Sequence, residues 1–308
     1  MRSHDLNPSF HRTLRDEATQ RRLCQTLGLA TQPRTPDMPT QEPFVREAGA
    51  GPAVVCLHSN ASSSAQWRSL MDSLSKTHHV LAPDSYGSGK SPEWSSDRTI
   101  SLSDEVDLLE PVLARAGPVF TLVGHSYGAA VALIATLRDP RRIRALVLYE
   151  PTLFALEESQ MPSPNGVDGI RNAVAAASAA LDLGDQDSAA KHFIDFWMGD
   201  GSWARTPPER KPSIARSVVN IRRWAHALFT EPTPLAAFSA LNMPILYLTG
   251  GSSPESARAV ARRLAPALPK VRVIELPNVG YMGPVTHPEM VNEAIIGFLG
   301  EAQRMGLQ

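Results

Sequence analysis

The sequence predicts an α/β fold with a mostly parallel sheet that helices cover on both faces. Two patterns carry this prediction. Six short runs are mostly apolar, as expected for strands that are buried on both faces. Helical patterns lie between most of these runs, which favours parallel strands joined by crossover helices. The predicted strands are residues 52–58, 79–84, 119–123, 145–149, 244–249 and 271–276.

The predicted helices alternate with those strands along most of the chain. Apolar residues recur at helical spacing in residues 65–74, 102–116, 129–138, 256–267 and 288–299. Residues 1–43 have a different character, with a polar helical pattern at 9–27 followed by a proline-rich stretch. We therefore expect an N-terminal extension at 1–43 and an α/β domain at 44–150 and 244–308.

A long segment, residues 151–243, separates two of the predicted strands. It contains helical patterns at 170–181, 189–197 and 214–229 and no clear strand. It is either a structural insertion or a helical cap over the carboxyl edge of the sheet, where ligands bind in open α/β folds. We favour the cap, and expect Phe193, Trp197 and Trp224 to contribute to its apolar inner face.

Composition narrows the class of protein. The chain has 308 residues, 20% of them charged, with a net charge of −1, so nothing favours nucleic acid or an anionic membrane as a partner. Only two cysteines are present, which fits a reducing cytoplasm. No run approaches the roughly 20 apolar residues that span a bilayer. Since no metal or dinucleotide motif occurs either, we expect a small-molecule substrate and no cofactor.

The run Gly124-His125-Ser126-Tyr127-Gly128 lies between a predicted strand and a predicted helix. A serine at the apex of such a sharp turn is the arrangement of a nucleophile elbow. Glycine is required at both flanks because a side chain there would collide with the neighbouring strand and helix. We therefore expect Ser126 to be a nucleophile and the Tyr127 backbone N–H to be one donor to an oxyanion.

A second oxyanion donor is expected from the loop that follows residues 52–58. This loop reads Ser59-Asn60-Ala61-Ser62, and small polar residues allow a backbone N–H to point into a site. Ser59 and Asn60 are the two candidates, and we slightly prefer Ser59.

These motifs together resemble the α/β-hydrolase superfamily, in its lipase, esterase and peroxidase-like branch with a helical cap. The resemblance extends from about residue 44 to residue 299. It rests on the elbow, on the run 84–91 after a strand, on Leu57-His58 with Trp67 downstream, and on residues 280–288 near the end. It implies an α/β-hydrolase fold and a pocket with His58, Trp67 and Trp197 near the serine. A serine at the apex, where the epoxide-hydrolase and dehalogenase branches carry aspartate, argues against those two branches.

The resemblance also implies an acid that orients a catalytic base. The family usually carries it after the strand at 244–249, but the run 250–256 contains no aspartate. Some members carry it after the strand that follows the elbow helix, and Glu150 stands there in this chain. We prefer Glu150 as the acid, with Glu255 as the alternative.

The base is where this chain departs from the family. By resemblance, a histidine belongs at the position that Tyr281 occupies, in the loop after the last strand. A tyrosine keeps its proton at pH 7 and accepts a second one poorly. His287 is a substitute base, although Thr286 and Glu289 predict a capping box that places His287 in the first turn of a helix, where the helix dipole disfavours an imidazolium.

The sequence therefore leaves two functions open. The first is an esterase-type hydrolase that acts on a small apolar ester, lactone or thioester through Ser126. The second is a member of the fold that binds a small molecule and turns it over poorly or not at all, because Tyr281 replaces the family's histidine.

Overall fold

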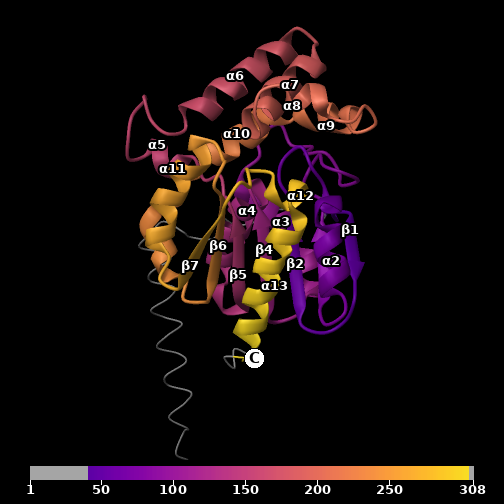
Figure 1. Ribbon diagram of the computed structural model, residues 1–308, viewed down its shortest axis with the longest axis vertical. Helices are drawn as coiled ribbons and strands as arrows, with labels where there is room; N and C mark the ends of the chain where they lie inside the picture. Colours follow the sequence, from indigo (N-terminus) through magenta and orange to yellow (C-terminus); the bar gives the residue numbers. More distant parts are fainter. Residues whose placement is uncertain (1–40, 305–308) are drawn as a thin grey trace, which may run out of the picture. The chain divides into compact units, whose positions relative to one another are not determined.

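The computed structural model describes residues 41–304, so the predicted helix at 9–27 lies outside the described residues. The described chain forms a seven-stranded sheet in the order β1-β3-β2-β4-β5-β6-β7 (Figure 1). The strands are β1 (Val45–Ala48), β2 (Ala53–Leu57), β3 (His79–Pro83), β4 (Phe120–His125), β5 (Ile143–Tyr149), β6 (Ile245–Gly250) and β7 (Val271–Leu276). Six of them are parallel, and β1 pairs antiparallel to β3 at one edge.

The helices account for the predicted periodic segments. Those of the α/β domain are α2 (Arg68–Leu74), α3 (Leu102–Arg115), α4 (Tyr127–Arg138), α11 (Glu255–Leu264), α12 (Gly283–Thr286) and α13 (Pro288–Arg304). Those between β5 and β6 are α5 (Ala155–Glu158), α6 (Asp168–Asp182), α7 (Gln186–Met198), α8 (Ser202–Arg205), α9 (Lys211–Val218) and α10 (Ile221–Phe229). The predicted α/β fold, with helices flanking a mostly parallel sheet, is therefore correct.

Alternate strand residues pack into two separate cores, one on each face of the sheet. Val55 of β2 and Leu122 of β4 face the larger core, which also contains α3, α4 and α11. Their neighbours Cys56 and Val123 face the smaller core, which contains α2 and α13. Since successive strand side chains point to opposite faces, burial on both sides explains why these strands are apolar throughout.

The helices between β5 and β6 lie together over one end of the sheet (Figure 1). They are attached to α11, where Ser256 Oγ accepts a hydrogen bond from the Ile170 backbone N–H at 3.3 Å. The Arg263 guanidinium also pairs with the buried Glu157 carboxylate at 2.9 Å. These contacts hold α5 and α6 next to the carboxyl ends of the strands, where Ser126 lies.

One predicted helix is interrupted. The segment 214–229 was expected to be continuous, but α9 ends at Val218 and α10 begins at Ile221. The apolar spacing runs through the break, so periodicity alone does not reveal it. The separation lets α9 pack against α7 while Ile221 and Trp224 of α10 face the pocket beside Ser126.

Candidate active site

Ser126 lies between the last residue of β4 and the first residue of α4, in a strained backbone conformation. Its φ and ψ are 58° and −118°, outside the regions that residues with a Cβ ordinarily adopt. The Ser126 N–H donates to the Tyr149 carbonyl of β5 at 2.9 Å. The turn therefore presents the Ser126 side chain at the carboxyl end of the sheet, as a nucleophile elbow requires.

The two flanking glycines are required by close backbone approaches. A Cβ on Gly124 would lie 2.5 Å from Cα of Ala129, at the start of α4. A Cβ on Gly128 would lie 2.4 Å from the Leu57 carbonyl oxygen, at the end of β2. Because only glycine permits these approaches, the elbow stays pressed against the loop after β2.

That contact brings the expected oxyanion donors close to Ser126. Tyr127 is the first residue of α4, where a backbone N–H has no partner inside the helix. The Ser59 N–H is already directed to Gln66 Oε1, at 3.3 Å, whereas Asn60 lines the same pocket as Ser126. The geometry therefore favours Asn60 as the second oxyanion donor, although the sequence had slightly favoured Ser59.

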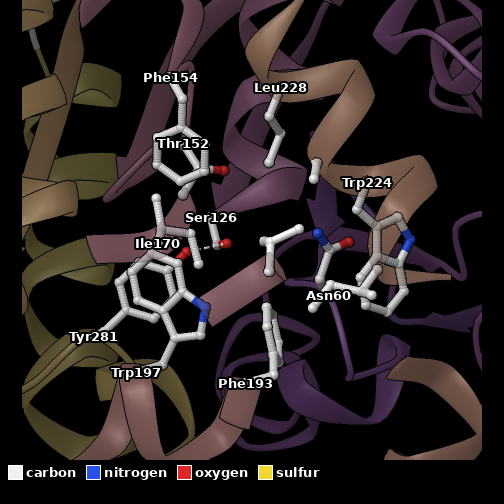
Figure 2. Close-up of a pocket in the computed structure, with 13 residues that line it drawn as sticks. Asn60, Ser126, Thr152, Phe154, Ile170, Phe193, Trp197, Trp224, Leu228 and Tyr281 are labelled. Carbon is white, nitrogen blue, oxygen red and sulfur yellow. Dashed lines mark hydrogen bonds between the residues drawn. The ribbon is translucent and has the colours of Figure 1, made fainter. Parts of the chain in front are cut away.

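Tyr281 contacts Ser126 directly. Its phenol donates a hydrogen bond to Ser126 Oγ, and Figure 2 shows the two side chains meeting. Its ring stacks on Trp197 with a centroid separation of 3.6 Å and an interplanar angle of 16°. Burial raises the pKa of Tyr281 well above its usual range, and the charge of Glu150 acts in the same direction. The phenol is therefore neutral at physiological pH and donates to Ser126 rather than taking its proton.

Glu150 is buried at the end of β5, close enough to Tyr281 to affect its pKa. One carboxylate oxygen accepts from the Gly250 N–H at 2.9 Å and the other from the Ser253 hydroxyl at 2.9 Å. Burial raises the pKa of Glu150 to about 7. Glu255, the alternative acid, is exposed and forms an ion pair with Arg262 on the surface of α11. The geometry therefore favours Glu150.

His287 is exposed between α12 and α13, outside the residues that line the pocket. The predicted capping box is wrong, because Thr286 is the last residue of α12 and its hydroxyl donates to the Met282 carbonyl at 3.1 Å. His287 Nδ1 is 2.9 Å from the Thr286 hydroxyl. The location of His287 does not support a role as substitute base.

Two residues expected at the pocket serve the scaffold instead. His58 Nδ1 is 2.7 Å from the Ser59 carbonyl, and His58 Nε2 accepts from the Ser85 N–H at 3.0 Å, so the ring joins the loops after β2 and β3. Burial lowers the pKa of His58. Trp67 is buried in the smaller core, which lies on the face of the sheet opposite to the larger core. Neither side chain lines the pocket.

His125, which precedes Ser126, supports the loop after β7 that carries Tyr281. Its Nε2 is 2.9 Å from the Tyr281 carbonyl, and its ring packs edge-on against Tyr149. Burial lowers the pKa of His125 to about 3. The ring is thus neutral, and its Nε2 is engaged by the Tyr281 carbonyl.

The pocket above Ser126 is narrow and apolar (Figure 2). Aromatic and aliphatic side chains from α6, α7 and α10 form most of its wall, and no lining residue is charged. The lining residues are Asn60, Ser126, Thr152, Phe154, Ile170, Val174, Phe193, Trp197, Ile221, Trp224, Ala225, Leu228 and Tyr281.

Sequence reasoning missed Thr152 and Phe154 as pocket residues. Both follow β5 closely, a position that usually faces the site in a parallel sheet. Their position shortly after Glu150 is the feature of the sequence from which a place in the pocket could have been predicted. Ser253 was also missed, because its role depends on a hydroxyl that reaches Glu150 across 103 positions of sequence.

Within residues 41–304, no group of three or more histidine, cysteine, aspartate or glutamate side chains is placed to hold a metal ion. The helices of the same region are all too short or too polar to cross a membrane.

Comparison with known proteins agrees with this architecture. Residues 52–288 match the family described as alpha/beta hydrolase fold. The chain is 25% identical to (E)-2-((N-methylformamido)methylene)succinate hydrolase of Acinetobacter baylyi, over 82% of this chain and 92% of that protein. It is 32% identical to lipase LipV of Mycobacterium tuberculosis, over 72% and 78%. It is 33% identical to a haloalkane dehalogenase of Bradyrhizobium diazoefficiens, over 82% and 89%. Since the family match covers most of the chain, and the mostly parallel sheet and the elbow serine agree with it, the chain belongs to the α/β-hydrolase fold family.

Proposed function

We propose that this chain is a hydrolase with Ser126 as its nucleophile and a small, neutral, apolar ester, lactone or thioester as its substrate. The observation that carries the proposal is the strained elbow, which presents Ser126 in a pocket without a charged wall. An uncharged pocket favours a neutral ligand, because an isolated charge is costly to bury. Hydrolases and a lipase among the relatives support the reaction class.

In the proposed reaction, Ser126 Oγ attacks the acyl carbon and the carbonyl oxygen becomes an oxyanion. The backbone N–H groups of Tyr127 and Asn60 hold that oxyanion, since both residues border the elbow. Glu150 stands where the acid would orient a base. This assignment is supported by its buried position beside the Tyr281 loop and its charge effect on Tyr281.

The missing component is the proton acceptor. A neutral phenol that donates to Ser126 Oγ does not activate it. Losing one member of a catalytic unit typically lowers kcat by a factor on the order of 10⁴–10⁶, with residual catalysis from the oxyanion donors and binding. We therefore propose that the chain as it stands hydrolyses its substrate slowly.

The hydrogen bond between Tyr281 and Ser126 also favours a second function, binding of a small molecule without turnover. The donated hydrogen bond occupies the oxygen that would attack. The apolar wall of the pocket would still bind a neutral ligand.

Hydrolysis of p-nitrophenyl acetate and butyrate separates the two functions. The slow-hydrolase proposal predicts a weak rate that Ser126→Ala abolishes. An equal rate in the parent chain and Ser126→Ala would refute nucleophilic catalysis by Ser126 and leave the binding function. Circular dichroism of both proteins controls for folding.

We further propose a reducing, cytoplasmic setting for the protein. The proposal is supported by the low cysteine count and by Cys56, which is a buried free thiol in β2.

A further inference from the structure

Thr152 is a buried polar side chain for which the fold provides no hydrogen bond. The residue is 1% exposed, and its hydroxyl oxygen has no hydrogen-bond partner. Burial raises the pKa of the nearby Tyr281 phenol, and the Thr152 hydroxyl acts against that rise, but the two hydroxyls do not meet hydrogen-bond geometry. Thr152 lines the same pocket as Ser126. Because an unpartnered buried hydroxyl is costly, one that faces a pocket points to a ligand.

The sheet order places this hydroxyl opposite the oxyanion donors. Strand β4, which carries Ser126, lies between β2 and β5. Asn60 follows β2 and Thr152 follows β5, so the two residues flank the nucleophile from opposite sides. In Figure 2, Asn60 lies to the right of Ser126, Tyr281 to its left and Thr152 above it.

An ester placed over Ser126 presents two oxygens to these two sides. Its carbonyl oxygen turns to Tyr127 and Asn60, where the backbone donors lie, so its alkoxy oxygen turns to Thr152 and Tyr281. During acyl transfer the Ser126 Oγ–carbon bond forms and the carbon–alkoxy bond breaks. The proton lost by Ser126 ends on the alkoxy oxygen, which leaves as an alcohol.

We propose that the Thr152 hydroxyl binds the alcohol oxygen of the leaving group and selects oxygen over sulfur at that position. This inference rests on the proposed function, and it narrows the substrate class to oxygen esters and lactones. A hydroxyl forms a strong hydrogen bond with an alcohol oxygen, whereas a thiol is a weak donor and a weak acceptor. The alkyl part of the leaving group then contacts the apolar wall.

The inference is tested by titrating the unaltered chain with 1-butanol and, separately, with 1-butanethiol. NMR chemical shifts measure the binding of each ligand. Thr152→Val should weaken 1-butanol binding about 3- to 10-fold, as expected for one hydrogen bond, and change 1-butanethiol binding less than about 2-fold. Thr152→Ser should keep the preference for the alcohol. Val174→Ala, in the same pocket wall, is the matched control and should weaken both ligands alike.

Thermal unfolding separates this role from a structural one. Because the Thr152 hydroxyl has no partner in the fold, Thr152→Val should leave Tm unchanged or raise it. A Tm lowered by several degrees, equal effects on both ligands, or no binding of 1-butanol to the unaltered chain would each overturn the inference. Binding is measured without turnover, so a chain that binds 1-butanol through Thr152 but hydrolyses no ester would contradict only the proposed hydrolysis.

Discussion

The phenol of Tyr281 donates a hydrogen bond to Ser126 Oγ, across 155 positions of sequence. The elbow supplies a strained serine at the end of β4, and the loop after β7 supplies the residue that meets it. In the family that this chain resembles, a histidine belongs at that meeting point. Under the proposed function, Ser126 retains the geometry of a nucleophile, and Tyr281, a hydrogen-bond donor, occupies the place of the proton acceptor.

Tyr281→Phe tests whether the phenol takes part in proton transfer. The ring can remain stacked on Trp197, but the hydrogen bond to Ser126 is lost. We expect the Ser126-dependent rate of p-nitrophenyl butyrate hydrolysis to change less than about 3-fold, since a neutral phenol with a raised pKa is not a base. A loss of about 10²-fold or more would show that Tyr281 does act in catalysis.

Glu150→Gln should alter the pH dependence of stability. The pKa of Glu150 is raised from 4.5 to about 7 in the folded state, mainly by burial. The folded protein therefore binds this proton more tightly than the unfolded chain, and the free energy of unfolding falls as pH rises from about 4.5 to 7. The full effect is about 3 kcal/mol.

Urea unfolding of the parent and Glu150→Gln at pH 5 and pH 8 measures this effect. We expect the variant to lose less stability than the parent between these two pH values. The buried Glu105, whose pKa is raised to about 8, contributes in the same direction to both proteins and cancels in the difference. Parallel pH profiles would contradict the assignment of a raised pKa to Glu150.

Gly128→Ala should damage the elbow. The added Cβ would lie 2.4 Å from the Leu57 carbonyl oxygen, and backbone cannot yield as a flexible side chain does. We expect a loss of about 3 kcal/mol in the free energy of unfolding, measured with urea. Gly297→Ala in α13 is the matched control, because its Cβ would meet no atom within 4 Å. That change should stabilise the protein by about 0.5–1 kcal/mol. Equal stability of the two variants would argue against a tight elbow.

The fold was predictable because local patterns carry it. Strand β2 (Ala53–Leu57) lies within the predicted residues 52–58, since an apolar run bounded by turn residues marks a buried strand. Strand β1 was missed, because Val45–Ala48 is short, partly exposed and pairs antiparallel at the sheet edge. A four-residue edge strand lacks the continuous apolar run that identified central strands such as β2.

The site was less predictable because it depends on contacts between distant segments. The sequence placed Ser126, Glu150 and Tyr281 at strand ends, and the structure brings them into one region. It did not reveal that His58 joins two loops or that Thr152 faces the pocket. Those roles follow from side-chain directions, which residue type and spacing do not determine.

We propose that the site lacks only its proton acceptor, and Tyr281→His tests this proposal most directly. The measurement is kcat/KM for p-nitrophenyl butyrate, with Ser126→Ala added to the histidine variant as the control. We expect Tyr281→His to raise kcat/KM by about 10³-fold or more, and Ser126→Ala to abolish the gain. No gain in a variant that folds with an unchanged Tm would contradict the claim, as would a gain that survives Ser126→Ala.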